Sequence, residues 1–196
     1  MKRKKRRNRK SSGLKGFLLL VILVGVGIGF LSLFHEELSR LARPWLERRG
    51  FVGEKKGVIL YFSDGQAKYL VGEKREIKKG EDVEQEATEL LQELIQGPKG
   101  QFLPTLPSKT RLLSIQLEDG GTARVNFNQS FTRDHPGGSS AEIMTVYSVV
   151  NSLALNFPEV KRVQFLVEGK EIETITGHLS LIRPLSPRPD LIKSPG

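Results

Sequence analysis

Three kinds of side chain that serve in hydrolytic enzymes lie close together in the middle of this chain. Asp134 and His135 could act as an orienting acid and a general base, with Ser139 or Ser140 as the nucleophile of an acyl transfer. Adjacent residues point in unrelated directions, however, and no sharp turn of the kind that exposes a nucleophilic serine is present. Ser139 also pairs with Glu142 in the pattern of a capping box, which gives it a structural role. We therefore predict no catalytic residue.

Metal and cofactor sites have equally little support. His35, His135 and His178 are far apart and lack the spacing of metal ligands. The chain has no cysteine, which excludes disulfides, thiolate catalysis and cysteine-based zinc sites. Gly25 and Gly29 follow no strand and precede no soluble helix, so they do not form a dinucleotide fingerprint. We predict no metal and no cofactor.

A polar but neutral stripe is the first candidate for binding. No charge occurs from Ile143 to Phe157, where an ordinary solvent-facing helix would carry Lys and Glu. Such a stripe could pack on a partner protein without burying an unpaired charge. The alternative, which we prefer because small polar helix faces are usually core, is packing against the sheet or the Pro-rich loop of the same domain. The stripe consists of Thr145, Ser148, Asn151 and Ser152.

A charged triplet is the second candidate for binding. Glu73, Lys74 and Arg75 lie in a predicted strand and could line a groove for a cell-wall glycan or peptide. The simpler interpretation is a solvated edge of that strand.

The elements that must position these residues follow from hydrophobic periodicity and turn signals. Val58–Phe62 is apolar on both faces, which predicts a central strand. Pro158 ends the helix that carries the neutral stripe. The predicted fold class is α+β, a single mixed β-sheet with two helices on one face. The expected order is strands 58–62 and 67–77, a helix from Asp82 to Gly97, a hairpin 113–127, a helix from Ser139, and strands 163–167 and 172–175.

The N-terminal part predicts a membrane anchor. The formal net charge of the protein is +9, and the whole excess lies in residues 1–16, which contain no acid. The next eighteen residues, 17–34, carry no charge, so we expect a transmembrane helix with a cytoplasmic N-terminus. A cleaved signal peptide is the alternative, with Gly27-Ile28-Gly29 as a small-x-small site, but the apolar run continues past it. The rest of the chain would then be extracytoplasmic.

This placement also bears on nucleic acid and on domain organisation. Beyond residue 16 the basic and acidic residues are equal in number, so no nucleic-acid-binding surface is expected despite the sequence pI near 9.9. The predicted parts are a basic cytoplasmic tail 1–16, a transmembrane helix 17–34, a charged spacer 35–57, a folded domain 58–183 and a Pro-rich disordered tail 184–196.

Several segments together resemble the GerMN domain family, over about Val58–Leu185. The most specific of them is GGSSAE, followed by YSVVNSL, FPEV and QFLVEGK. The resemblance also includes LYFSDGQAKYLVGEKREI, LLQELIQGP and LLSIQLEDGGTARVNFNQSF. The family is associated with sporulation and spore germination in Gram-positive, endospore-forming bacteria.

The resemblance implies an extracytoplasmic, non-enzymatic domain similar to the ring-building motifs of the sporulation channel between mother cell and forespore. It also implies work in assembling or anchoring that complex. This chain departs from the best-known member of the family in two ways. It has one GerMN unit instead of two, and an apolar segment instead of a lipid-modified cysteine.

The expected function is thus a membrane-anchored interaction module in spore formation or envelope assembly. Its partners would be other envelope or sporulation-complex proteins, the membrane through residues 17–34, and possible further copies of the same chain. The alternative is a module that binds the cell wall, that is, peptidoglycan.

Overall fold

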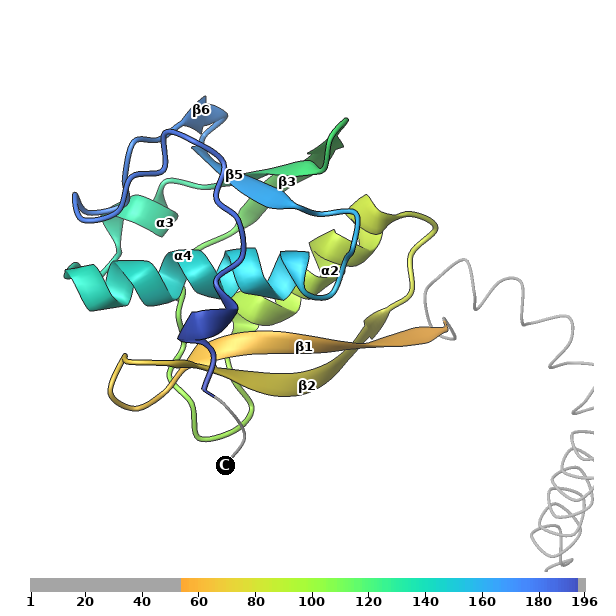
Figure 1. The fold of residues 1–196 in the computed structure, drawn as a ribbon, viewed down its shortest axis with the longest axis horizontal. Coiled ribbons are helices and arrows are strands. Elements are labelled where there is room, and N and C mark those ends of the chain that lie inside the picture. The colour runs from red at the N-terminus through yellow and green to blue at the C-terminus, as the bar shows by residue number, and fades with distance from the viewer. Residues whose placement is uncertain (1–53, 194–196) are drawn as a thin grey trace, which may run out of the picture. The chain divides into compact units, whose positions relative to one another are not determined.

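Two β-sheets enclose a layer of two helices in the computed structural model, which describes residues 54–193 (Figure 1). The first sheet is a hairpin of β1 (Lys55–Ser63) and β2 (Leu70–Lys78). The second contains β3 (Leu112–Glu118), β4 (Thr122–Phe127), β5 (Arg162–Val167) and β6 (Lys170–Glu171), in that order. The helices of the middle layer are α2 (Val83–Gln96) and α4 (Ser139–Ala154), and α3 (Ser130–Arg133) is a single short turn.

The α+β class is confirmed, but the single mixed sheet with both helices on one face is wrong. Only the second sheet is mixed, because β4 runs parallel to β5 and antiparallel to β3. The apolar residues of β1 had predicted a central strand, yet β1 pairs with β2 alone. Its inner face, with Val58, Leu60 and Phe62, is buried, whereas Ile59 is 39% exposed. A helix layer, and not a third strand, covers the apolar side of this hairpin.

The free edge of β1 is closed by side chains of and just after α4. Asn156 accepts a hydrogen bond from the Ile59 amide (2.9 Å) and donates one to the Ile59 carbonyl (2.7 Å). Ser152 Oγ accepts from the Tyr61 amide (3.0 Å). Farther along, Ser63 and Leu103 exchange backbone hydrogen bonds. These partners replace the neighbouring strand that the edge would otherwise need.

The β3–β4 hairpin and both ends of α2 match their sequence predictions. The turn is formed at Gly120 and Gly121, which have φ of 87° and 82°. A Cβ atom at Gly121 would lie 2.6 Å from the Glu159 carbonyl oxygen, so a side chain cannot be accommodated there. Asp82 caps α2 by accepting from the Gln85 amide at 2.8 Å, and the helix ends at Gly97.

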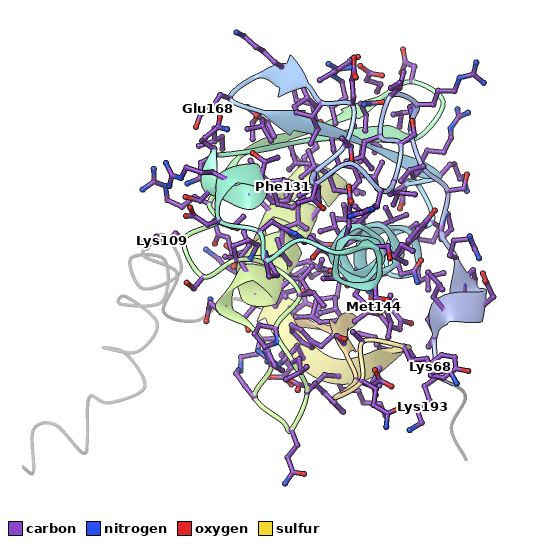
Figure 2. The ribbon with its side chains drawn as sticks, turned by 90° about the vertical axis from the view of Figure 1, so that its left-hand side faces the viewer. Lys68, Lys109, Phe131, Met144, Glu168 and Lys193 are labelled. Atoms are coloured by element: carbon purple, nitrogen blue, oxygen red, sulfur yellow. The ribbon has the colours of Figure 1, made fainter. Side chains whose placement is uncertain are left out.

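The Pro-rich tail is not disordered as far as Lys193, which corrects the sequence prediction. Leu185 forms an antiparallel bridge with Val163 in the second sheet. The chain then crosses α4, and the Lys193 amide donates to the Leu70 carbonyl of the first sheet at 2.8 Å. Figure 2 places Lys193 beside Lys68 accordingly. The tail therefore ties the two sheets together.

Other predicted boundaries fall partly or wholly outside the described residues. The predicted basic tail 1–16, the transmembrane helix 17–34 and most of the spacer 35–57 lie there. Residues 55–57 of that spacer belong to β1, so the folded unit begins before residue 58. Within residues 54–193, no helix has the length and apolar character needed to cross a membrane.

We predict that Asn156→Ala lowers the free energy of unfolding by about 1–2 kcal/mol, because the Ile59 amide and carbonyl lose their partner. Urea denaturation followed by circular dichroism measures the change. Leu155→Ala is the matched control, since Leu155 is exposed and should change stability by less than about 0.5 kcal/mol. Equal stability of the two variants would contradict the role given to Asn156.

Candidate functional site

The residues considered for hydrolysis do not contact one another in the required way. Asp134 pairs with Arg133, with 2.9 Å between Oδ1 and Nε. His135 Nδ1 accepts from the Gly137 amide at 3.0 Å, which assigns the ring proton to Nε2, 3.0 Å from Thr145 Oγ1. Both ring nitrogens of His135 are thus engaged in hydrogen bonds with neighbouring residues of the domain. Burial lowers the pKa of His135, and this favours the neutral ring that these contacts require.

The neutral stripe of α4 faces the interior of the domain. Thr145 is 2% exposed, and Ser148, Asn151 and Ser152 are fully buried. Thr145 Oγ1 donates to the Thr105 carbonyl in the Pro-rich loop, and Ser148 Oγ donates to the carbonyl of Thr145. The docking hypothesis for this stripe is wrong, and the preferred interpretation as internal packing is confirmed.

The contacts of Asn151 with the C-terminal tail explain why α4 carries an amide side chain at position 151. Its Nδ2 donates to the Arg188 carbonyl at 3.0 Å and its Oδ1 accepts from the Arg188 amide at 2.8 Å. An amide side chain satisfies both backbone groups of one residue in the same way that a neighbouring strand would. Asn151 therefore holds the C-terminal tail, as Asn156 holds β1.

The charged triplet in β2 divides into one buried residue, Arg75, one partly buried residue, Glu73, and one exposed residue, Lys74. Lys74 is exposed, as the solvated-edge interpretation requires. Arg75 is only 7% exposed and donates to Glu73, to Glu93 of α2 at 2.9 Å and to the Gly97 carbonyl at 2.9 Å. The solvated-edge interpretation is therefore wrong for Glu73 and Arg75, which join β2 to the C-terminal end of α2.

Glu73 is held as a carboxylate by its surroundings. Burial alone would raise the pKa of Glu73, but hydrogen bonds from the amides of Lys99 and Gly100, together with Arg75, lower it. The carboxylate thereby fixes the loop after α2. What stays open beside this network is a groove of about 830 Å³, which Lys74, Lys99 and Phe102 help to line.

Glu142 has a different structural role from the one that the sequence predicts. The capping box is wrong, because Gly138 is the N-cap residue and makes no side-chain cap. The fully buried Glu142 carboxylate instead accepts hydrogen bonds from a single loop after β6. The donors are Thr174 Oγ1 (2.6 Å), Thr176 Oγ1 (2.9 Å) and the amides of Ile175 (2.9 Å), Thr176 (3.2 Å) and His178 (2.9 Å).

The electrostatics of Glu142 follow from these contacts. Burial acts to raise the pKa of Glu142, and the hydrogen bonds from Thr174, Thr176 and His178 outweigh it and lower the pKa to about 2. The two threonines separated by one residue were the available sequence signal, since their hydroxyls and amides can face one acceptor. Glu142 serves as an anchor for this loop.

An apolar cavity of about 330 Å³ lies between the Pro-rich loop and the start of α4. Leu103, Leu106 and Met144 contribute to its walls, and Leu103 is 46% exposed at its edge. Among residues 54–193, no group of three or more His, Asp or Glu side chains is placed to hold a metal ion. The features near the candidate residues that could bind a ligand are the groove beside β2 and this apolar cavity.

Comparison with known proteins assigns the family. The Germane family, described as "Sporulation and spore germination", matches residues 59–173, which is more than half of the chain. No curated protein sequence matches. The chain therefore belongs to the GerMN (Germane) family, as its sequence resemblance predicts.

Solved structures of similar fold agree with that membership. A candidate lipoprotein from Clostridium perfringens has a TM-score of 0.50 and 26% identity, over 67% of this chain and 87% of that one. The first GerMN domain of the sporulation protein GerM from Bacillus subtilis has a TM-score of 0.51 and 24% identity, over 67% and 97%. The tandem GerMN domains of GerM give 0.52 and 24%, over 68% and 46%. The chain thus spans about one unit of that tandem pair.

We predict that Glu142→Gln lowers the free energy of unfolding at pH 7 by about 2–3 kcal/mol, because an amide cannot accept all the hydrogen bonds that the carboxylate accepts. The wild-type protein should also lose stability as the pH falls from 4.5 toward 2, since the pKa of Glu142 is lower in the folded state than in the unfolded one. Glu142→Gln should flatten that acid limb.

Denaturant unfolding at a series of pH values measures both effects. Glu159→Gln is the control, because Glu159 is exposed. A variant at position 142 that is as stable as this control at pH 7, with an unchanged acid limb, would contradict the anchoring role.

Proposed function

We propose that this chain is a membrane-anchored, extracytoplasmic interaction module that assists the assembly or anchoring of an envelope-spanning complex during sporulation or germination. Membership of the GerMN family is the observation that carries the proposal. The basic residues 1–16 and the uncharged segment 17–34 support the anchor. An anchored module has a raised effective concentration at the membrane, so weak contacts with a partner suffice.

The partner would contact the outer surface of the domain. The neutral stripe of α4 is committed to internal hydrogen bonds, and Ser148→Lys or Ser152→Glu would bury a charge and unfold the domain before any contact could be tested. Single charged substitutions at exposed apolar side chains are the better probes. In the described residues these side chains are Ile59, Leu103, Leu113, Leu155 and Ile182.

Two predictions follow from the proposal. Protease added to intact protoplasts should digest the chain beyond residue 34. A fluorescent fusion of the full chain should concentrate at the septal or engulfing membrane during sporulation. Deleting residues 17–34 should abolish the enrichment, and replacing them with an unrelated transmembrane helix should restore it. Complete protection from protease would refute the topology. A uniform membrane signal would refute a role in a sporulation complex.

A second candidate function is binding to peptidoglycan. The open groove beside β2 favours it, because Lys74 and Lys99 line it together with the aromatic ring of Phe102, whereas Lys55 in the same lining is paired with Glu76. Lysine ammonium groups suit the carboxylates of wall peptides, and an aromatic ring packs on sugar or aliphatic surface.

We predict that, if this second function holds, Lys74→Glu combined with Lys99→Glu reduces co-sedimentation of the full chain with purified peptidoglycan at least about tenfold, by replacing attraction with repulsion. Lys161→Glu combined with Lys170→Glu makes the same change of charge on the other sheet and serves as the control. Wild-type protein that stays in the supernatant would eliminate the peptidoglycan function.

A further inference from the structure

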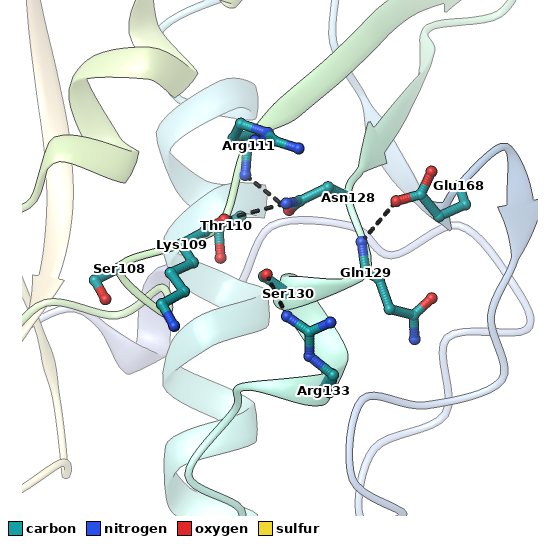
Figure 3. Close-up of a pocket in the computed structure, with 9 residues that line it drawn as sticks. All are labelled: Ser108, Lys109, Thr110, Arg111, Asn128, Gln129, Ser130, Arg133 and Glu168. Atoms are coloured by element: carbon teal, nitrogen blue, oxygen red, sulfur yellow. Dashed lines mark hydrogen bonds between the residues drawn. The ribbon is translucent and has the colours of Figure 1, made fainter.

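A polar cavity of about 570 Å³ lies at the other end of the Pro-rich loop, where that loop meets the end of β4 (Figure 3). It belongs to neither of the surfaces considered above. Its lining residues are all polar or charged, which distinguishes it from the apolar cavity beside Leu103. They are Ser108, Lys109, Thr110, Arg111, Asn128, Gln129, Ser130, Arg133 and Glu168.

The walls of this cavity are fixed by hydrogen bonds. Asn128 Oδ1 accepts from the Arg111 amide at 2.8 Å, and Asn128 Nδ2 donates to the Lys109 carbonyl at 3.1 Å. The Thr110 amide closes a turn on the Pro107 carbonyl at 2.9 Å. The loop that supplies the cavity is therefore held against the end of β4 by the Asn128 side chain, and the Asn128 amide also donates to the Arg111 carbonyl at 3.0 Å. A rigid site loses little conformational entropy when a ligand binds.

The opposite wall is fixed as well. Glu168 and Gly169 have φ of 50° and 78°, the backbone of the tight turn that joins β5 to β6. This turn brings the Glu168 carboxylate to the Gln129 amide, 2.9 Å away. Glu168 is thus engaged by the protein backbone and closes the cavity on that side.

A buried hydroxyl in this cavity has no protein partner. Thr110 is 3% exposed, and its Oγ1 makes no hydrogen bond within the described part of the chain. Leaving a buried hydroxyl unpaired is unfavourable, so the observation calls for an explanation. Figure 3 shows the Thr110 hydroxyl facing the same space as Ser130 Oγ and the guanidinium group of Arg133.

The charge of the surroundings favours an anion. Lys109, Arg111 and Arg133 are basic, against Glu168 in the lining and Asp134 beside it. Asp134 occupies Arg133 Nε and shares Nη2, which also donates to Ser130 Oγ at 3.1 Å. The hydrogen bonds of Arg133 within the described chain thus use Nε and Nη2, and Nη1 remains available for a ligand.

We propose that this cavity binds an oxyanion, a phosphate or a carboxylate group, which accepts hydrogen bonds from Thr110 Oγ1 and Arg133 and is neutralised by Lys109. Both kinds of group match the donors of a guanidinium and a hydroxyl. The site goes beyond the proposed function, because it concerns a small charged group and depends on neither the anchor nor a partner protein.

The test is thermal unfolding of the full chain in zwitterionic detergent, at pH 7 and constant ionic strength, with sodium phosphate, sodium acetate or sodium chloride. A specific site predicts a saturable rise in Tm of about 5 °C or more with phosphate or acetate over chloride. Thr110→Val and Arg133→Gln should each weaken the response about tenfold. Arg162→Gln, which removes an exposed charge elsewhere, should leave it unchanged.

The Thr110→Val variant separates binding from stability. It removes an unpaired hydroxyl and keeps the shape of the side chain, so its Tm in chloride should equal or exceed that of the wild type. Isothermal titration calorimetry with phosphate and with acetate gives the affinity directly and decides between the two groups. The proposal is overturned if neither anion acts more strongly than chloride, or if Thr110→Val binds as the wild type does. It is also overturned if Arg162→Gln loses as much affinity as Arg133→Gln.

Discussion

The architecture depends on how the open edge of the first sheet obtains its hydrogen bonds. A two-stranded hairpin leaves backbone amides and carbonyls unpaired along each strand, and burying them without partners is costly. Here Ser152 and Asn156 bond to the backbone of β1, and Asn151 does the same for the tail at Arg188. A Lys or Glu at these positions would remove a backbone partner and also bury a charge. This requirement accounts for the uncharged stretch of α4, which lies between two sheets and has no solvent-facing side.

The buried charged residues act as connectors between elements. Arg75 links β2 to Glu93 and to the carbonyl of Gly97, the C-cap residue of α2, and Glu142 accepts hydrogen bonds from five donors in the loop 174–178. Each of these charges is compensated by hydrogen bonds with its immediate neighbours, which is the condition for a buried ion to be tolerated. Arg75 and Glu142 therefore serve the structure of the domain.

The sequence predicted what local periodicity controls. Asp82 and Gly97 delimit α2, and the alternation around Asp119–Gly121 gave the β3–β4 hairpin and its turn. It could not predict the number of sheets, because the apolar run at Val58–Phe62 is the same whether its partner is a strand or a helix layer. The capping-box pattern at Ser139 was equally ambiguous, since Glu142 finds better donors more than thirty residues away. The oxyanion cavity escaped notice because its walls come from three separated segments.

The hydrogen bonds of the C-terminal tail have a consequence for when the layers of the domain can be joined during synthesis. Residues 185–193 hydrogen-bond to β5, to α4 and to β2, so they bridge layers whose own strands share no backbone pairing. Synthesis runs from the N- to the C-terminus, so this segment is made after every strand and both long helices of the domain. The hydrogen bonds that tie the two sheets together across α4 can therefore form only after this segment has been made.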